Sequence, residues 1–457
     1  MGTGAIMTTA SVGCPVGWFH DPLVPQGKEY DAGMMSIDRR GLLLGGSAAA
    51  LAACAGSAPT TRSQAEATDA TEFDPFDWAS VRAQFPLDTN LVHLAAFVLA
   101  AHPKPVRAAI DRHRQELDAD TEGYLQETWM LEENVRAAAA SYLGAEPGQI
   151  ALTDSTTMGT GLLYSGLRLV PGQDIVTTTH DFHATVEGLR LLVARTGAPM
   201  RRVALYDNPR AATETEILAR VRAAIGPRTR VVALTWVHSG TGVRLPIPAV
   251  AELIAELNNG RAPADRALLC VDGVHGFGVV DAGVVDLGCD FLTTGTHKWL
   301  FGPRGTGLLW GRAWDALAPL IPTFSGTETP GAVHTPGGYH SFEHRWAVRE
   351  AFDFHRRIGR ARIAKRVTEQ ATQLKAGLRG IPTVTLITPD DPNLSAGIVC
   401  CEVDGMDAFT ATRRLREQHR IVASVTPYEQ QYLRFGPSMV TTPEQIDRTI
   451  EAVKLLR

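Results

Sequence analysis

The sequence predicts an α/β protein with a large, mostly parallel sheet covered by helices on both faces, followed by a smaller α+β domain. Two patterns in the 457 residues support this expectation. From about residue 100, short apolar runs alternate with longer runs of helical spacing, as in parallel sheets with helical crossovers. Around residues 320–345 the composition changes to Pro, Gly, Thr and His, which indicates a domain junction.

The alternation predicts each element in turn. Apolar residues at helical spacing predict helices over 103–117, 131–143, 158–169, 184–194, 213–224 and 248–257. Short apolar runs predict strands over 150–152, 174–178, 202–205, 230–235, 267–271, 290–294 and 306–310. Ligands in such sheets bind beyond the carboxyl ends of the strands, so the residues that follow the strands are the first candidates for a site.

The beginning of the chain is predicted to be an export leader. Arg39 and Arg40 precede a short apolar run over 41–53, a pattern typical of a twin-arginine signal. This run is too short for a membrane-spanning helix. Cys54, after Leu-Ala-Ala, either resembles a lipidated cysteine, which would anchor the protein to a membrane, or lies beside an ordinary cleavage site.

These patterns divide the chain into four parts and predict a periplasmic or otherwise exported protein. The parts are a leader over 1–54, a tether over 55–75, a large domain over 76–330 and a small C-terminal domain over 331–457.

Composition excludes some classes of partner. With 44 Lys and Arg against 49 Asp and Glu, the net charge is −5, so no broad basic surface for nucleic acid is expected. No disulfide framework is expected either, and Cys400 and Cys401 lie in an apolar, strand-like run. Histidines at 334, 340, 344 and 355 lack acidic or cysteine companions, so they are interpreted as loop residues and no metal is expected.

Residues with useful chemistry gather where strands end. Lys298 follows one predicted strand in a Gly-rich turn, and Asp272 ends another. Ser155, Thr156 and Thr157 precede a helix, whose N-terminus favours a phosphate. An amine, a carboxylate and a phosphate site together predict pyridoxal phosphate. The lysine would bind its aldehyde as a Schiff base, and the carboxylate would keep its ring nitrogen protonated.

Residues from about 90 to 450 resemble the class V aminotransferases, of the PLP fold-type I architecture shared with cysteine desulfurases and isopenicillin-N-epimerase-like proteins. The strongest motif is Thr-His-Lys298 followed by Gly-Pro-Arg-Gly-Thr-Gly, supported by Val-Asp272-Gly-Val-His275. The resemblance implies pyridoxal phosphate as the cofactor and an amino acid or peptide as the substrate. It also implies a homodimer in which both chains line each site.

The resemblance implies roles for individual residues. Lys298 corresponds to the lysine that holds the cofactor and then acts as general base, and Asp272 to the partner of the ring nitrogen. Arg434, in Arg-Phe-Gly-Pro-Ser, corresponds to the arginine that binds the substrate carboxylate. The other implied cofactor contacts are the phosphate ligands Ser155, Thr156, Thr157 and His297, the phenolic-oxygen neighbours His275 and Ser239, and the ring-stacking Phe182 or its neighbour His183.

Three positions depart from the family pattern. Ser239 stands where desulfurases often carry asparagine. Gly295 replaces a hydroxyl residue three before the lysine, which leaves Thr294 or Thr296 to make that phosphate contact. The segment 342–346 stands where relatives carry a Gly-Thr pair that reaches the partner subunit's phosphate, with Arg345 as the electrostatic substitute.

The reaction is left open among transamination, racemisation, elimination and decarboxylation. In the desulfurases that this chain resembles, a nucleophilic cysteine lies in the loop before the carboxylate arginine. Residues 421–432 contain no cysteine, so desulfuration is disfavoured. With the leader, this favours the isopenicillin-N-epimerase-like branch, which includes a periplasmic enzyme that tailors pyoverdine, and it predicts tailoring of an exported peptide metabolite such as a siderophore.

Four alternatives remain beside that prediction. Two are activities on a free amino acid, namely epimerisation and a C–S lyase or desulfurase-like reaction. A third is a non-catalytic periplasmic binding protein. The fourth is a serine hydrolase that uses Ser239, although the sequence around it lacks a GxSxG motif.

Overall fold

The computed structural model describes residues 73–456, which belong to one compact unit. The predicted leader with Cys54 and nearly all of the tether lie outside the described residues. Each helix and strand predicted above is present, and its ends lie within three residues of the expected ones.

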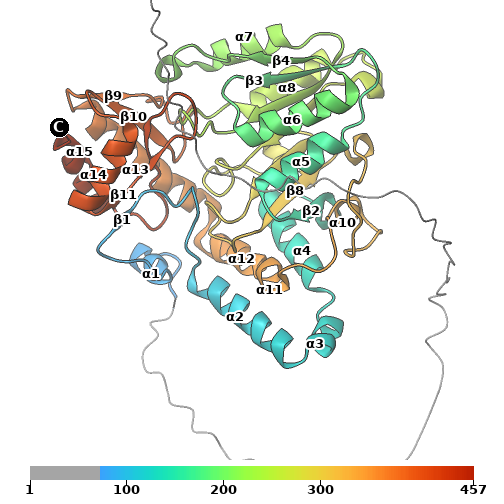
Figure 1. Ribbon diagram of the computed structural model, residues 1–457, viewed down its shortest axis with the longest axis horizontal. Coiled ribbons are helices and arrows are strands. Elements are labelled where there is room, and N and C mark those ends of the chain that lie inside the picture. The colour runs from blue at the N-terminus through green and yellow to red at the C-terminus, as the bar shows by residue number, and fades with distance from the viewer. Residues whose placement is uncertain (1–72, 457) are drawn as a thin grey trace, which may run out of the picture. The chain divides into compact units, whose positions relative to one another are not determined.

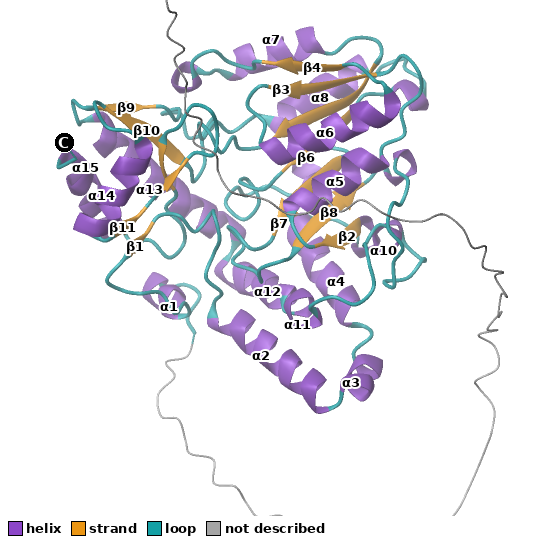
Figure 2. Ribbon diagram, viewed as in Figure 1, coloured by secondary structure: helices purple, strands orange, loops and turns teal. Residues whose placement is uncertain are grey.

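A seven-stranded sheet forms the core of the larger part of the structure, drawn at the right in Figures 1 and 2. In spatial order its strands are β2 (Ile150–Thr153), β8 (Gly307–Gly311), β7 (Phe291–Gly295), β6 (Leu268–Asp272), β5 (Thr229–Thr235), β3 (Asp174–Thr178) and β4 (Met200–Val203). β8 runs in the direction opposite to that of the other six strands, which are all parallel to one another. The predicted α/β class with a mostly parallel sheet is confirmed.

Helices on both faces explain why these strands are apolar throughout. In β5, Val231 and Ala233 pack in one interior, and Val232 and Leu234 pack in the other. The first interior is covered by α5 (Thr156–Gly166) and α6 (His183–Thr196). The second is covered by α4 (Leu131–Leu143), α7 (Glu214–Ala224), α8 (Ile247–Leu257), α9 (Val284–Leu287) and α12 (Val348–Ile358).

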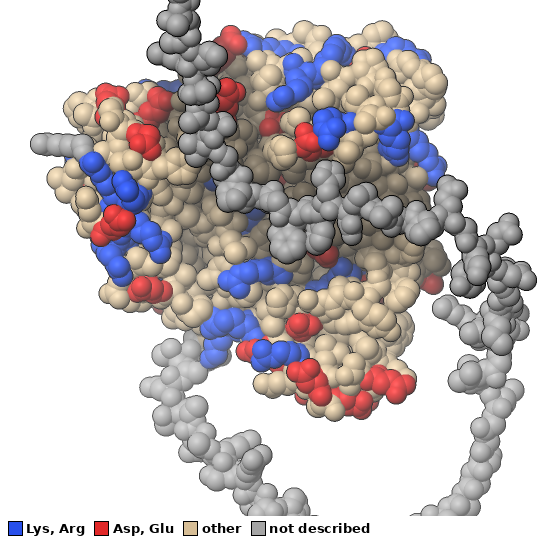
Figure 3. Space-filling model, viewed as in Figure 1, with Lys and Arg blue, Asp and Glu red and all other residues tan. Residues whose placement is uncertain are grey.

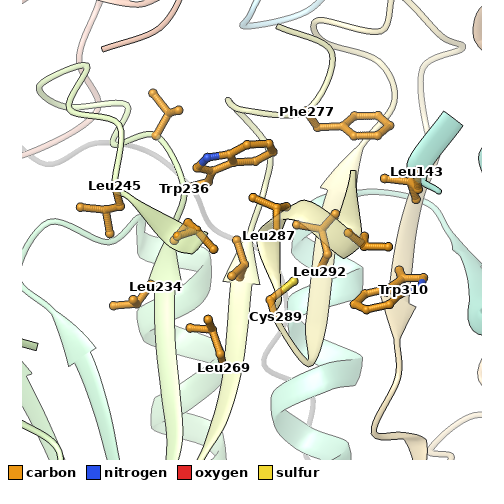
Figure 4. Packing of buried hydrophobic residues seen from close by; sticks show 14 of the residues in the cluster. Leu143, Leu234, Trp236, Leu245, Leu269, Phe277, Leu287, Cys289, Leu292 and Trp310 are labelled. Carbon is orange, nitrogen blue, oxygen red and sulfur yellow. The ribbon is translucent and has the colours of Figure 1, made fainter. Parts of the chain in front are cut away.

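Large apolar side chains fill the second interior. Figure 4 shows Leu234, Leu269 and Leu292 from three neighbouring strands, with Trp236 and Trp310 beside them. Burial of this area supplies the main driving force for the layered arrangement. The ends of the strands are thereby fixed as a rigid edge on which a site can be built.

The C-terminal part contains a second, antiparallel sheet. Its strands in spatial order are β12 (Ser424–Val425), β13 (Leu433–Phe435), β10 (Val399–Val403) and β9 (Val384–Leu386). Its apolar core also takes residues from α13 (Arg360–Arg379), α14 (Ala408–His419) and α15 (Pro443–Lys454). This arrangement agrees with the expected α+β character, while the domain boundary at 330/331 stays a prediction.

The first described residues lie against the C-terminal part. β1 (Val92–His93) pairs in parallel with β11 (Ile421–Val422), and Figure 1 shows the two strands side by side. The remaining helices are α1 (Trp78–Ala83), α2 (Lys104–Ala119), α3 (Thr121–Glu127), α10 (Pro330–Val333) and α11 (Phe342–Trp346). Between β1 and α2, Ala95 bridges to Gly436 and Ala100 N–H donates to the carbonyl of His297, so this segment lies close to residues that follow β13 and β7.

Helix hydropathy and surface charge complete the description of residues 73–456. No helix in this part is both long and apolar enough to cross a membrane. On the face drawn in Figure 3, Lys and Arg side chains are scattered over several elements, with Asp and Glu among them.

Candidate active site

A cavity of about 450 Å³ lies beyond the carboxyl ends of β5 and β6. Most of the predicted site residues line it, namely Ser155, Thr156, Thr157, Phe182, Ser239, Asp272, His275, His297, Lys298 and Arg434. Two predicted site residues, His183 and Thr296, do not. The fold therefore brings together residues that are widely separated in the sequence, at the edge of the sheet where a ligand is expected.

Lys298 lies in the turn between β7 and β8, and its amine faces the cavity without a hydrogen bond to any described residue. Burial lowers the pKa of Lys298 to about 8; the carboxyl of Asp272 opposes this shift, and Arg434 adds to it. A lysine with this pKa has an appreciable neutral fraction near pH 7 and can act as a nucleophile or a base.

Asp272 ends β6 and is only 1% exposed. Its carboxyl accepts hydrogen bonds from the Val274 N–H (3.1 Å) and from the Thr185 hydroxyl of α6 (3.3 Å). Burial raises the pKa of Asp272 to about 6, although the Val274 N–H opposes the shift. Such a carboxyl is well placed to stabilise a positive charge brought into the cavity. Thr185 carries no sequence signal, because its role depends on the packing of α6 against β6.

Two histidines line the cavity, and burial favours the neutral form of each ring. Burial lowers the pKa of His275 well below its usual value, and the Trp299 indole N–H donates to His275 Nδ1 at 3.3 Å. Nε2 of His275 therefore carries the ring proton and is a donor. Burial also lowers the pKa of His297, whose Nδ1 lies 3.1 Å from the carbonyl oxygen of Thr306.

The N-terminus of α5 opens into the cavity. Ser155 is its N-cap and accepts a hydrogen bond from the Met158 N–H at 3.1 Å. The buried hydroxyl of Thr156 has no hydrogen-bond partner among the described residues. Free N–H groups, the helix dipole and an unpaired hydroxyl together suit a bound phosphate.

The structure corrects the expectation for Thr294 and Thr296. The Thr296 hydroxyl is bonded to that of Thr306, and the Thr294 hydroxyl lies 3.4 Å from the carbonyl oxygen of Gly295. Neither residue lines the cavity. A Cβ atom on Gly295 would lie only 3.0 Å from Thr156 Oγ1, so the glycine leaves room for Thr156. The free hydroxyl at this place is therefore that of Thr156.

Arg434, in β13, presents a buried guanidinium group to the cavity. Its Nε donates to Ser424 Oγ (3.0 Å), and its two terminal nitrogens donate to the carbonyls of Ser239 (3.0 Å) and Val425 (3.3 Å). The group lies 4.7 Å from the centre of the Phe97 ring. Within residues 73–456 it has no acidic partner at ion-pair distance, so an anionic ligand can supply one.

The segment between β3 and α6 provides the expected aromatic residue. Phe182 lines the cavity, whereas His183 begins α6 and is exposed to solvent. Asp181 fixes this segment, because its buried carboxyl accepts hydrogen bonds from Thr178 N–H (2.7 Å) and from Thr235 N–H (2.8 Å). Of the two predicted stacking residues, only Phe182 is therefore in position to contact a planar ring.

Tyr428 is a neighbour of the site that the sequence did not suggest. Its hydroxyl lies 2.7 Å from Ser239 Oγ, and its ring lies edge-on to Phe182 at 6.2 Å. A Cβ atom on Gly240 would meet the tyrosine ring at 3.0 Å. Ser239 is thus bound through its hydroxyl to Tyr428 and through its carbonyl to Arg434. The loop that carries Tyr428 has no periodic pattern, so no sequence signal points to this residue.

Arg345 forms ion pairs with two acidic residues of this chain. Its guanidinium lies 3.2 Å from Glu132 and 3.2 Å from Asp154, the residue before Ser155. Burial alone would raise the pKa of Glu132, but the nearby His340 ring (3.4 Å) and the charge of Arg345 lower it to about 2. Arg345 therefore approaches the phosphate site as part of a neutralised network, which does not support the expected role as a free positive charge.

Neither a metal site nor a reactive cysteine is evident in the described part of the chain. No group of three or more His, Cys, Asp and Glu residues there is arranged to hold a metal ion. Cys270, Cys289, Cys400 and Cys401 are buried and unpaired, and burial raises the pKa of each. None of these four thiols lines the cavity.

Comparisons with known proteins agree with this geometry. The family model of aminotransferase class-V proteins matches residues 121–425. The chain is 31% identical to isopenicillin N epimerase of Streptomyces clavuligerus, over 83% of this chain and 98% of that protein. It is 25% identical to a cysteine desulfurase of Enterobacter sp. (strain 638), again over 83% of this chain and 98% of the relative.

Solved structures share the fold. A mutant of the protein C-DES, with glycine covalently linked to its PLP cofactor, superposes with a TM-score of 0.76 at 20% identity. The match covers 82% of this chain and 99% of that chain. At this identity the similarity establishes the fold alone, and it confirms the predicted fold-type I architecture.

The class V family uses pyridoxal phosphate, and the residues of the cavity fit that cofactor. Lys298 offers an unbonded amine and Asp272 a buried carboxyl. The unpaired Thr156 hydroxyl at the N-terminus of α5 offers a phosphate site, and Phe182 offers an aromatic wall. Thr235 Oγ1, at the end of β5, is a second buried hydroxyl without a partner among the described residues. Polar groups of this kind are satisfied when a ligand enters.

Proposed function

Because the chain belongs to the aminotransferase class-V family, we propose that it is an exported, pyridoxal-phosphate-dependent enzyme that moves a proton at the α-amino carbon of an amino acid or peptide. We further propose that it epimerises this carbon and so tailors a peptide metabolite such as a siderophore. The observation that carries the proposal is the meeting of the Lys298 amine, the Asp272 carboxyl and the Arg434 guanidinium in one cavity.

The protein groups have distinct tasks in this mechanism. When bound, pyridoxal phosphate supplies an electron sink for the negative charge that develops on the substrate α-carbon. Asp272 would keep the sink effective, because its carboxyl would stabilise a proton on the ring nitrogen. The N-terminus of α5 with Thr156 would hold the phosphate, and Phe182 would offer an aromatic surface to the ring.

Lys298 moves the proton and Arg434 orients the substrate. Because burial lowers the pKa of Lys298, its amine can accept the α-proton near neutral pH. Arg434, fixed by three protein acceptors, still has guanidinium protons available for the substrate carboxylate. Fixing this carboxylate decides which substituent of the α-carbon faces the lysine.

Epimerisation is favoured over desulfuration by two observations. Over 83% of this chain, the Streptomyces clavuligerus epimerase is 31% identical, whereas a second epimerase, from Amycolatopsis lactamdurans, is 25% identical and desulfurases are 25–27% identical. Desulfuration also needs a cysteine nucleophile near the substrate, and none of the described thiols lines the cavity.

Two further parts of the proposal concern location and assembly. Arg39 and Arg40, followed by the apolar run 41–53, support export by the twin-arginine route, with Cys54 as a candidate lipid anchor. A homodimer is supported by large apolar side chains exposed on this chain, among them Trp129 (74%), Phe324 (75%) and Tyr339 (80%).

The reaction can be tested with the purified, cofactor-loaded protein in deuterated water. Free amino acids and peptides with a free α-amino and α-carboxyl group are followed by mass spectrometry and by chiral chromatography. We expect deuterium at the α-carbon together with its inversion. Release of sulfide from cysteine without inversion would instead identify a desulfurase-like enzyme, and no visible cofactor band would favour the binding-protein alternative.

Export needs a separate experiment. The full-length chain is compared with the double variant Arg39→Lys, Arg40→Lys in cells that possess the twin-arginine system. We expect the unchanged chain in the periplasmic fraction and the variant in the cytoplasm. Equal distribution of the two would contradict this part of the proposal.

A further inference from the structure

The wall of the cavity next to Arg434 includes a short apolar segment that is fixed at both ends. Near its start, the carbonyl of Leu94 accepts a hydrogen bond from Gly436 N–H at 2.7 Å. At its other end, Ala100 N–H donates to the carbonyl of His297 at 3.0 Å. The segment is thus held between the neighbour of Lys298 and a residue close to Arg434.

Within this segment, Phe97 and Val98 line the cavity. Phe97 is fully buried, lies against the Arg434 guanidinium and stacks on Trp299 with a centroid distance of 5.6 Å. Val98 is 48% exposed, so it forms part of the rim. The fixed backbone and the packed ring mean that this wall is preformed.

A second apolar wall of the same cavity is formed by residues that lie next to Arg434. Val425, which ends β12, and Pro427, in the loop that follows, both line the cavity. The Val425 carbonyl also accepts a hydrogen bond from Arg434 at 3.3 Å, which fixes this wall relative to the guanidinium. Arg434 therefore contacts one residue of each apolar pair, Phe97 through its ring and Val425 through its carbonyl.

Charged groups are absent from these two walls. The titratable side chains that line the cavity are Asp272, His275, His297, Lys298 and Arg434, and each has a place in the cofactor site or at the substrate carboxylate. Within the described residues, none remains to pair with a charge at the end of a substrate side chain. Burying an unpaired charge is costly, whereas apolar surface gains free energy on burial.

We propose that Phe97, Val98, Val425 and Pro427 form a side-chain subsite that selects substrates whose α-carbon carries an uncharged, apolar chain. The chain can end free or continue into a peptide through an amide. This inference rests on the proposed function, because it assumes that Arg434 binds the carboxylate of an amino-acid centre at which Lys298 acts.

The first test is equilibrium binding of L-norvaline, L-norleucine, L-glutamate and L-lysine to the cofactor-loaded protein. Binding is followed by the change in visible absorbance and by calorimetry, neither of which requires turnover. We expect the Kd to fall about fourfold from norvaline to norleucine, the effect of burying one methylene (about 0.8 kcal/mol). We expect glutamate and lysine to bind at least about tenfold more weakly than norleucine.

A pair of variants locates the subsite. Val98→Arg adds a positive charge to the rim and is expected to weaken norleucine binding and strengthen glutamate binding, each by about tenfold. Leu99→Arg is the matched control, because Leu99 is similarly exposed (52%) but does not line the cavity. We expect its binding constants to match those of the unchanged protein, and thermal unfolding establishes that both variants are folded.

The outcomes separate the two proposals. Glutamate or lysine binding as tightly as norleucine, or equal effects of the two variants, would overturn the subsite while leaving the reaction at the α-carbon intact. If the protein carries cofactor but no amino acid or peptide changes its absorbance, the proposed function fails, and the subsite fails with it.

Discussion

Lys298 and Lys375 are two of six lysines in the chain, and burial lowers the pKa of both to about 8. Their surroundings are otherwise opposite. The Lys375 amine, on α13, donates to the carbonyl of Pro389 (2.7 Å), to the carbonyl of Asp390 (3.1 Å) and to Ser395 Oγ (2.7 Å). The Lys298 amine makes no hydrogen bond to a described residue and faces a cavity.

The comparison shows that a lowered pKa does not by itself identify a catalytic lysine. Lys375 uses all three of its donors to join α13 to the segment 389–395, which is a structural task. Lys298 keeps its donors unused beside the carboxyl of Asp272 and within reach of a ligand. Unused hydrogen-bonding capacity that faces a cavity is therefore the more informative observation.

The largest expected effect separates the two lysines by activity. Lys298→Ala removes both the cofactor-binding amine and the base, so we expect α-proton exchange to fall by at least about 10³-fold. Lys375→Met removes only structural hydrogen bonds, so exchange should stay within about twofold of the unchanged protein. Both rates are measured by deuterium incorporation at 25 °C, and reduction with borohydride should fix the cofactor onto the protein only where Lys298 is present.

The result that would break the comparison is a similar loss in both variants. It would mean that the lowered pKa, and not the access to the cavity, is what matters for the reaction.

The sequence predicted the strand-end residues of this site but not the residues that complete it. Lys298 and Asp272 follow apolar strands, so the pattern that predicts the sheet also predicts where their side chains meet. Phe97 and Tyr428 lie in segments without periodicity. Their positions depend on backbone hydrogen bonds to distant residues and on contact with Ser239, which local sequence does not encode.

The choice among hydroxyl groups could not be made from the sequence either. Thr156 belongs to the predicted phosphate-binding segment 155–157, and Thr296 directly precedes His297, another predicted phosphate ligand. Only the fold shows that the Thr296 hydroxyl is bonded to Thr306, while the Thr156 hydroxyl has no partner among the described residues. Which donors remain free is a property of the folded turn, not of residue type.

A second prediction uses the pH dependence of cofactor loading. Only the neutral amine of Lys298 can bond to the cofactor aldehyde, so with a pKa of about 8 the loading rate should rise about tenfold per pH unit up to pH 8 and then level off. Stopped-flow absorbance of the cofactor-free protein measures this rate. In Asp272→Asn the plateau should begin at lower pH, because the Asp272 carboxyl raises the pKa of Lys298.

A loading rate that still rises at pH 10 would mean that Lys298 has an ordinary lysine pKa. This result would contradict the statement that burial lowers the pKa of Lys298 as it does that of Lys375. A plateau shifted upward in Asp272→Asn would contradict the assigned electrostatic contact.

The smallest expected effect concerns stability and completes the contrast. Lys375→Met leaves the acceptors at Pro389, Asp390 and Ser395 without their donor, which should lower the free energy of unfolding by about 1–3 kcal/mol at neutral pH. Lys365→Met is the control, because Lys365 is exposed and makes only a 3.8 Å ion pair with Glu369. Both are measured by denaturant unfolding of the cofactor-free protein.

The pH dependence of this difference has a definite sign. The pKa of Lys375 is lower in the folded protein than in the unfolded chain, so between about pH 8 and pH 10.5 the unfolded chain binds more protons. The stability that Lys375 contributes must therefore grow as the pH rises through this window and shrink as it falls. The deficit of Lys375→Met relative to the unchanged protein should widen toward pH 10, while that of Lys365→Met stays constant. A deficit that narrows instead would mean that the charged amine is the favoured form at Lys375, so that its hydrogen bonds outweigh burial.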